Sequence, residues 1–192
     1  MRALLFYNMS NIFLASDHHV SHTNLLTFKQ SDGVTPLRTF DDVTHMNDYM
    51  VKQHNRVVQS SDRVYFLGDF CFHKRDLPIL NRMNGRKVLI KGNHDKLELK
   101  DYLPYFDDIR GSYQLDGFIL THIPVHPNSL GKWPVNVHGH LHHNVVTRTI
   151  QDIGEVYDPR YFNVSMECLD DYTPISLEEL KKEQKFRLDY DF

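Results

Sequence analysis

The first half of the chain alternates short apolar runs with segments of helical periodicity. Apolar runs bounded by polar residues predict three buried strands, at 11–16, 64–67 and 87–90. Apolar side chains recur at helical spacing after Asp41 and Asp42, which predicts a helix that ends near Val58. A shorter helix, with Pro78 near its start, is expected to end at Gly85. This alternation indicates an α/β fold with right-handed crossover connections.

The second half shows short strand patterns separated by turn residues. Asp116-Gly117 lies between two strand-like runs and is typical of a β-hairpin. Further strands are predicted at 134–140, 144–150 and 160–166. Ser176 and Glu179 form a capping box, which predicts a C-terminal helix. Because no repeat or linker divides the sequence, we expect residues 1–192 to form one domain, with residues 1–8 as an N-terminal extension.

Composition and charge are those of an ordinary globular protein. Of the 192 residues 41% are hydrophobic and 24% charged, so disorder is not expected. The net charge of −3 lacks the basic excess of duplex-binding proteins, although a metal site would add positive charge and leaves a nucleic-acid substrate open. The sequence has no membrane-length apolar run and no secretory pattern, so we expect a cytoplasmic protein without a membrane partner. Cys71 and Cys168 are expected to be reduced thiols.

Polar side chains of the kinds that bind metals follow five predicted strands. In chain order they are Asp17, His19, Asp69, Asn93, His94, Asp95, His122, His140 and His142. Because ligands collect at the carboxyl ends of strands in α/β sheets, we expect these side chains to share one site. Gly68, Gly92 and Gly139 each precede one of them, where the backbone must approach closely. Carboxylate, carboxamide and imidazole groups without thiolate suit Mn, Fe, Zn, Co or Ni, and their number exceeds the need of a single ion.

These blocks, in this order, resemble the calcineurin-like metallophosphoesterase superfamily. The residues that carry the resemblance are Asp17-x-His19, Gly68-Asp69, Gly92-Asn93-His94-Asp95, His122 and Gly139-His140-x-His142. The surrounding sequence is similar to the small single-domain phosphoesterases of bacteria and their phages. The resemblance implies an α/β fold in which two mixed β-sheets pack as a sandwich flanked by helices.

The resemblance also implies a role for each residue. One metal would be held by Asp17, His19, Asp69 and His142. The second would be held by Asp69, Asn93, His122 and His140, with Asp69 as the bridge. A hydroxide shared by the two ions would attack phosphorus, His94 would protonate the leaving oxygen, and Asp95 would orient His94. Manganese is the expected metal, with Fe, Zn, Ni or Co as alternatives.

Other side chains near these blocks have weaker assignments. His22, His73 and His126 lie on loops that should surround the site, where they would contact substrate phosphate or be solvated. The Phe and Tyr residues around Cys71 are expected to be core residues and not a platform for stacking a nucleobase.

The predicted function is hydrolysis of phosphate esters, with small phosphodiesters or nucleotide-like molecules as the expected substrates. The alternatives are a compact nuclease, a phosphomonoesterase that uses the same site, a catalytically silent binding scaffold, and metal storage. The run at 138–143 differs from the H-x-H-x-D-H pattern of metallo-β-lactamases because His142 stands in place of the aspartate, so we exclude that class.

Overall fold

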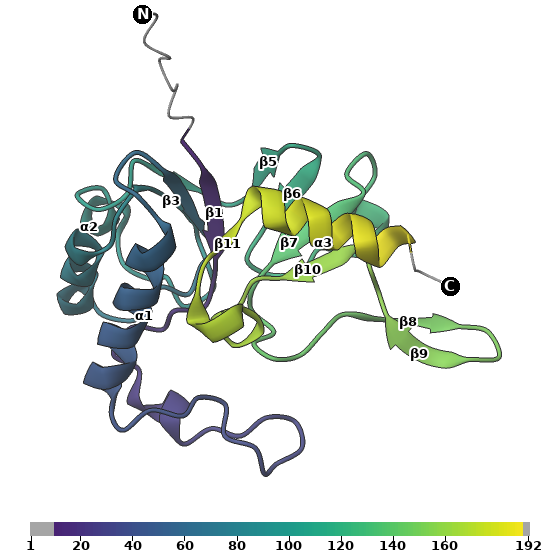
Figure 1. Ribbon diagram of the computed structural model, residues 1–192, viewed down its shortest axis with the longest axis horizontal. Helices are drawn as coiled ribbons and strands as arrows, with labels where there is room; N and C mark the ends of the chain where they lie inside the picture. Colours follow the sequence, from purple (N-terminus) through teal and green to yellow (C-terminus); the bar gives the residue numbers. More distant parts are fainter. Residues whose placement is uncertain (1–9, 190–192) are drawn as a thin grey trace, which may run out of the picture.

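Two β-sheets form the centre of the molecule, which a computed structural model describes over residues 10–189 (Figure 1). The N-terminal extension expected at residues 1–8 lies outside the described residues. The first sheet has the strand order β11-β1-β2-β3-β4, in which β1 to β4 are parallel and β11 is antiparallel to β1. Its strands are β1 (Ile12–Ala15), β2 (Arg63–Phe66), β3 (Arg86–Ile90), β4 (Asp108–Arg110) and β11 (Ile175–Ser176).

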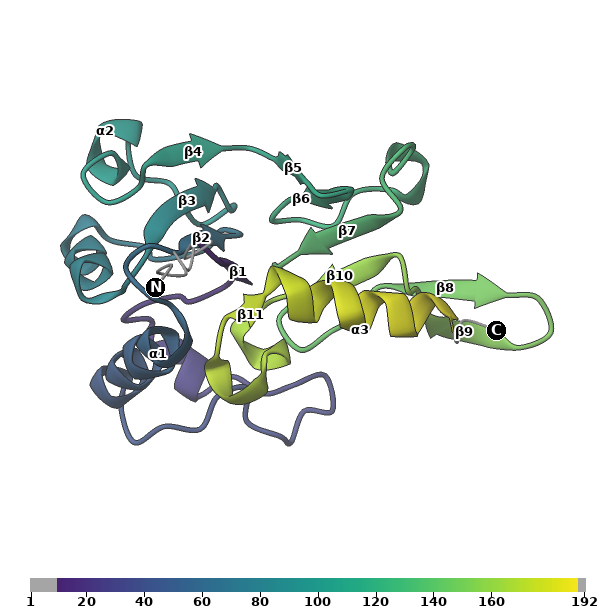
Figure 2. The same ribbon diagram turned by 45° about the horizontal axis from the view of Figure 1, so that its top comes forward.

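The second sheet has the order β10-β7-β6-β5, with β5 antiparallel to β6 and the other pairs parallel. Its strands are β5 (Tyr113–Leu115), β6 (Phe118–Leu120), β7 (Val135–His138) and β10 (Tyr161–Asn163). Asp116 and Gly117 both have positive φ, 47° and 89°, as the tight turn between β5 and β6 requires. A separate hairpin of β8 (Thr147–Ile150) and β9 (Gly154–Tyr157) projects from the body (Figures 1 and 2).

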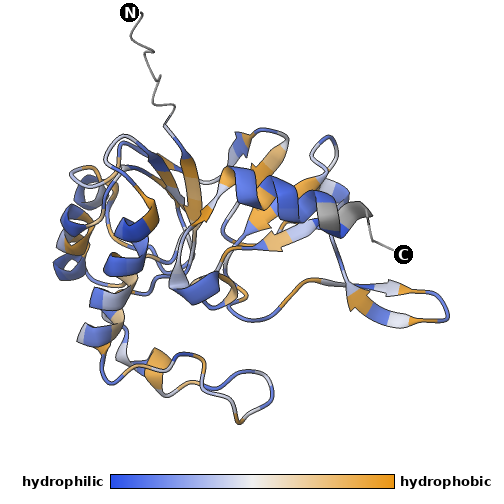
Figure 3. Ribbon diagram, in the orientation of Figure 1, coloured by the Kyte–Doolittle hydropathy of each residue, from blue (hydrophilic) through white to orange (hydrophobic). Residues whose placement is uncertain are grey.

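Alternate side chains of the first sheet enter two different apolar clusters, which explains why its strands are buried on both faces. Leu14 and Tyr65 face the second sheet, whereas Phe13 and Phe66 face the helical side. In the ribbon coloured by hydropathy, the central strands are largely hydrophobic and the flanking helices contain many hydrophilic residues (Figure 3). The architecture is a mixed α/β sandwich flanked by helices, as the sequence predicted.

The helices flank these sheets and have identifiable start signals. They are α1 (Val43–Val57), α2 (Leu99–Tyr102), α3 (Leu177–Asp189) and the 3₁₀ helices η1 (Thr23–Leu26), η2 (Lys74–Arg82), η3 (Pro127–Ser129), η4 (Met166–Cys168) and η5 (Asp170–Tyr172). The Asp42 side chain caps α1 by accepting the His45 N–H at 2.8 Å. The Ser176 hydroxyl and Glu179 carboxylate form the predicted capping box of α3.

Two differences from the sequence prediction have local causes. The segment before Gly85 forms a 3₁₀ helix with Pro78 inside it, since proline lacks the N–H that a continuous α-helix needs there. Strands β4, β9 and β11 were not predicted; each spans two to four residues, too few to show periodicity.

None of the helices in residues 10–189 combines the length and the apolar composition that crossing a bilayer requires.

Candidate metal centre

The predicted metal-binding residues meet because the strands that precede them end side by side. Asp17 and Asp69 follow the parallel neighbours β1 and β2, and the Asp17 N–H donates to the Gly68 carbonyl at 3.0 Å. The second sheet contributes in the same way, since the Gly139 N–H donates to the His122 carbonyl at 2.9 Å beyond β7 and β6. The carboxyl ends of strands from both sheets therefore surround one site.

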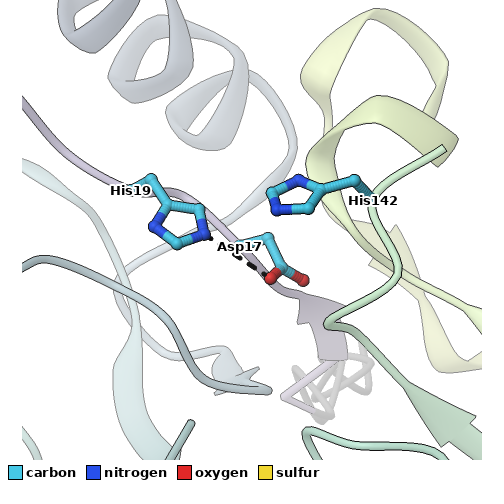
Figure 4. A group of neighbouring side chains, drawn as sticks. All are labelled: Asp17, His19 and His142. Atoms are coloured by element: carbon cyan, nitrogen blue, oxygen red, sulfur yellow. Dashed lines mark ion pairs between the residues drawn. The ribbon is translucent and has the colours of Figure 1, made fainter. Parts of the chain in front are cut away.

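The first cluster consists of Asp17, His19 and His142 (Figure 4). One ligand atom from each residue lies within 4.8 Å of the others. The His19 Nε2 is 3.7 Å from Asp17 Oδ1, and the His142 ring enters from the loop after β7. The two imidazole rings stack with centroids 5.3 Å apart and planes at 20°, which leaves their edges beside the same carboxylate.

The second cluster consists of Asp69, His122 and His140, again with ligand atoms within 4.8 Å of one another. The His122 Nδ1 lies 2.7 Å from the Leu67 carbonyl, an acceptor, so that nitrogen carries the proton. The His122 Nε2 faces two oxygens, Asp69 Oδ2 at 3.2 Å and Asn93 Oδ1 at 2.9 Å. An ion between these atoms would require this nitrogen to be deprotonated. The amide oxygen of Asn93 thus lies beside the second cluster.

Asp69 connects the two clusters through a single oxygen atom. Its Oδ2 lies 3.7 Å from the His19 Nε2 and 3.2 Å from the His122 Nε2. The other oxygen, Oδ1, accepts the His94 N–H at 2.8 Å, which fixes the carboxylate plane. Burial would raise the pKa of Asp69, but the hydrogen bond with His122 holds it below its usual value. An ionised carboxylate with one oxygen facing both clusters has the geometry of a bridging ligand.

Buried polar atoms without hydrogen-bond partners show that the first cluster suits a cation. Asp17 is fully buried, yet within the described chain its Oδ1 has no hydrogen-bond partner, and the same is true of both ring nitrogens of His19. Native proteins rarely leave such atoms unpaired, because an unpaired buried polar atom costs about 1–3 kcal/mol. Burial lowers the pKa of His19 to about 3, so its ring is neutral and able to coordinate a metal. The donor set therefore fits a divalent transition metal.

The backbone at the site is strained in a way that requires particular residues. Five of the seven predicted ligands have positive φ, between 46° and 70°; they are Asp17, His19, Asp69, His140 and His142. For residues other than glycine this region costs on the order of 1–3 kcal/mol each, and such strain concentrates at functional sites.

Glycines allow the loops of the site to approach one another. A Cβ at Gly92 would lie 2.2 Å from Asp69 Oδ1, and one at Gly139 would lie 2.4 Å from Asp17 Oδ2. Both contacts are too short to exist, so a side chain at either position would displace a predicted ligand.

Glu167 and Arg38 are buried charged residues that the sequence analysis missed. The Glu167 Oε1 lies 3.1 Å from His142 Nδ1 and 2.7 Å from the Arg38 guanidinium. Burial would raise the pKa of Glu167, but Arg38 and His142 lower it to about 2, so the carboxylate is ionised. Arg38 also donates to the carbonyls of Asp17 and His18, which ties this pair to the turn after β1. No sequence motif marks either residue, since both act only through tertiary contacts.

Asp95 has a different position from the one expected. Its Oδ2 accepts the N–H groups of Asp69 and Gly92, each at 2.8 Å, and its Oδ1 accepts that of Phe70 at 3.0 Å. Within residues 10–189 the hydrogen bonds of its carboxylate go to these backbone amides and not to the His94 ring. Asp95 therefore joins the turns after β2 and β3, and it would position His94 only through the backbone.

The three loop histidines occupy different positions. His22 is half-buried, and its ring centroid lies 5.8 Å from that of His19. His73 and His126 are exposed at the starts of η2 and η3, and His126 Nδ1 accepts the Asn128 N–H at 3.2 Å. The structure brings His22 to the site and shows no contact of the other two side chains with the clusters in the described residues.

The aromatic residues near Cys71 only partly follow the core prediction. Phe70 is fully buried, as is the Cys71 thiol, whose pKa is raised by burial to about 12. Phe72 is half-buried and its ring lies 4.9 Å from that of His94, at the site.

Two hollows lie near this part of the molecule. A pocket of about 390 Å³ is lined by Asn93, His122 and Lys91, next to the second cluster. A larger one, of about 820 Å³, lies between β10 and α3 and contains no residue of either cluster. The smaller pocket therefore adjoins the second cluster, whereas the larger one does not adjoin either cluster.

Comparisons with known proteins find similar chains in sequence and in structure. No protein-family model matches it. In overall structure it is similar to a protein of unknown function, AQ665, from Aquifex aeolicus, with a TM-score of 0.68, 25% identity and coverage of 91% of this chain and 99% of that one. A nuclease, MPE, from Pseudomonas putida gives a TM-score of 0.43 at 20% identity over 68% of this chain and 61% of the nuclease.

In sequence, the chain is 32% identical over 181 residues to the uncharacterized protein MJ1445 of Methanocaldococcus jannaschii. The match covers 91% of this chain and 92% of that protein. The chain therefore belongs to the same family as MJ1445.

Proposed function

We propose that this protein is a phosphoesterase of the calcineurin-like metallophosphoesterase superfamily that depends on two divalent metal ions. The observation that supports it best is the arrangement of two His/Asp clusters around one oxygen, Asp69 Oδ2. A carboxylate with a purely structural role needs no such arrangement, whereas an oxygen that faces two ion positions could serve as a ligand to both ions of a two-metal site.

The metal-binding residues divide between the two positions as the sequence resemblance implies. Asp17, His19, Asp69 and His142 would hold one ion, and Asp69, Asn93, His122 and His140 the other. Manganese is the metal we propose, because carboxylate, carboxamide and imidazole ligands suit it. Divalent ions held there supply Lewis-acid activation of a phosphate ester and of the attacking water.

Side chains of the protein would donate the proton to the leaving oxygen and hold the donor beside the metal-binding residues. The His94 ring lies at the edge of the first cluster, 5.7 Å between centroids from His19, and is half-buried. Its backbone N–H donates to Asp69 Oδ1 at 2.8 Å, which fixes the His94 main chain beside the proposed bridging carboxylate. We assign His94 to proton donation at the leaving oxygen, a step worth on the order of 10²–10⁴ in rate. We propose small phosphodiesters or nucleotide-like molecules as substrates.

A metal and substrate panel tests this function. Purified protein is stripped with a chelator, reloaded with Mn, Ni, Zn or Mg, and assayed on a bis-aryl diester, an aryl monoester, cyclic nucleotides and short RNA or DNA. We expect chelation to abolish diester hydrolysis and manganese to restore it, with two metal ions bound per chain. Protein that binds two ions per chain and hydrolyses none of these compounds would refute the proposal and favour a binding scaffold.

A further inference from the structure

Phe72 is an aromatic side chain at the candidate centre that does not belong to the core. Its ring centroid lies 4.7 Å from that of His22, 4.9 Å from that of His94 and 5.4 Å from that of His19. The preceding aromatic residue, Phe70, is fully buried within an apolar cluster, whereas Phe72 is only half-buried and belongs to none of the clusters found in residues 10–189. Hydrophobic burial alone therefore does not explain its position.

Phe28 extends this aromatic surface away from the metal-binding residues. It is 46% exposed, and its ring meets the His22 ring edge-to-face with centroids 5.9 Å apart. Phe28, His22 and Phe72 thus form a continuous row, which we call the aromatic strip. The strip begins at His94, the proposed proton donor, and ends at the solvent.

The loop that carries Phe28 is held in place at both ends. The Phe28 N–H donates to the Asn24 carbonyl at 3.0 Å, and the Phe28 carbonyl accepts the Leu37 N–H at 2.9 Å. Ser31, at the far side of the loop, binds His143 Nε2 through its N–H at 3.0 Å, next to the proposed ligand His142. An exposed phenylalanine on a loop anchored in this way is kept at a fixed distance from the centre, as a recognition surface must be.

We propose that the aromatic strip binds an aromatic ring carried by the phosphodiester, either a nucleobase or an aryl leaving group. This inference rests on the proposed phosphoesterase function. Flat rings stack on aromatic side chains with little dependence on sequence, and in nucleic-acid-binding proteins such stacking changes affinity roughly 5- to 150-fold per base. The strip contains only three rings, which favours a substituent the size of a nucleotide over a long polymer.

A matched substrate pair tests the strip. Thymidine 5′-p-nitrophenyl phosphate and methyl p-nitrophenyl phosphate share a leaving group and differ in the second ester, and a diester of two aliphatic alcohols has no ring. We expect Phe28→Leu and Phe72→Leu to raise KM at least fivefold more for the thymidine ester than for the aliphatic diester, with kcat changed less. An equal increase for both p-nitrophenyl esters assigns the strip to the leaving group, and an increase confined to the thymidine ester assigns it to the nucleobase.

Two controls separate recognition from packing. Val34, 75% exposed on the same loop, is the matched site, and Val34→Ala should leave all three substrates unaffected. Phe28→Trp should retain the preference for aromatic esters, since a larger ring still stacks. Equal losses on aromatic and aliphatic substrates, or lost metal in Phe28→Leu, would show that the rings only support the site and would overturn the inference. Wild-type protein that hydrolyses none of the three esters would instead contradict the proposed function itself.

Discussion

The imidazole Nδ1 of His142 lies 3.1 Å from the carboxylate of Glu167, a residue that is itself paired with buried Arg38. A carboxylate at Nδ1 fixes the proton on that nitrogen and leaves Nε2 as the free electron pair. Glu167 thereby sets the tautomer of a proposed metal ligand, and Arg38 keeps Glu167 ionised by lowering its pKa.

Replacing Glu167 by glutamine should weaken metal binding at the first cluster. The neutral amide is a poorer acceptor for His142 and leaves Arg38 without a counter-charge, so we expect manganese affinity to fall about 10- to 100-fold for one ion of the two. Metal titration of the folded protein with a calorimetric readout measures this. Glu155→Gln, on the exposed β8–β9 hairpin, is the matched control and should bind both ions as before. Unchanged affinity in Glu167→Gln would show that Glu167 does not orient His142.

Asp69→Asn should remove both metal ions, whereas Asp17→Asn should mainly remove one. The reason is that Asp69 Oδ2 faces both clusters, while the Asp17 carboxylate lies within the first cluster. Asparagine tolerates the positive φ at either position, so backbone strain does not confound the comparison. Mass spectrometry should find close to zero ions per chain in Asp69→Asn and close to one ion per chain in Asp17→Asn.

A control for those two variants is Asp152→Asn. Asp152 is exposed on the β8–β9 turn and also has positive φ, 67°, so the substitution repeats the chemistry away from the site. Its metal content should equal that of the wild type. If Asp69→Asn retained one tightly bound ion, its role as a bridge would be wrong.

His94→Gln should retain both metal ions and lose activity by about 10²–10⁴-fold on esters with poor leaving groups. Activated aryl esters need less protonation, so their hydrolysis should fall much less. Steady-state kinetics on a series of leaving groups measures this difference as a steeper dependence on leaving-group pKa. His73→Gln, at an exposed position, should keep the wild-type slope. An unchanged slope in His94→Gln would assign proton donation elsewhere.

Gly92→Ala should disrupt the centre although alanine is the smallest possible addition. Its Cβ would lie 2.2 Å from Asp69 Oδ1 and would push the carboxylate away from the His94 N–H. We expect loss of metal and a decrease of about 1–3 kcal/mol in the free energy of unfolding. Gly111→Ala is the matched control, because no atom lies within 4 Å of its added Cβ. Equal metal content in the two variants would disprove the close approach.

His54 should make the stability of the fold depend on pH between about 6.5 and 4. It is buried in α1 with Nε2 2.9 Å from the Asn84 carbonyl, and burial lowers its pKa from 6.5 to about 4. Between pH 6.5 and pH 4, His54 is therefore largely protonated in the unfolded chain and largely neutral in the folded protein. Stability is fully present above pH 6.5, falls as the pH decreases, and stops falling near pH 4, for a total of about 3 kcal/mol.

Chemical denaturation as a function of pH tests this contribution. His54→Gln should remove about 3 kcal/mol of the decrease in unfolding free energy between pH 6.5 and 4. The matched control is His45→Gln on the same helix, whose side chain is 48% exposed and which should leave the slope unchanged. An unaltered slope in His54→Gln would mean that another group causes the acid sensitivity.

Local signals made much of the fold predictable. Asp42 marks the start of α1, and Asp116-Gly117 marks the β5–β6 turn, because caps and tight turns depend on neighbouring residues alone. The convergence of both clusters was also predictable, since ligands that follow parallel strands must emerge at one edge.

Contacts between distant segments were not predictable. Glu167 and Arg38 are separated by 129 positions and meet only after both sheets have formed. The carboxylate of Asp95 was assigned to its neighbour in sequence, but the fold places the backbone amides of Asp69 and Phe70 closer to it. Phe28, the most exposed residue of the aromatic strip, lies on a loop whose sequence has no periodic pattern.

The positive φ angles at five of the proposed ligands limit which residues evolution or protein design can place there. Aspartate, asparagine and histidine tolerate this backbone conformation, whereas β-branched residues do not. Two requirements therefore restrict these positions. The side chain must offer an atom that binds the ion, and the residue must tolerate a positive φ. Replacing His19 or His142 by a β-branched residue would therefore require rebuilding the turns that present them, whereas exchange among aspartate, asparagine and histidine would not.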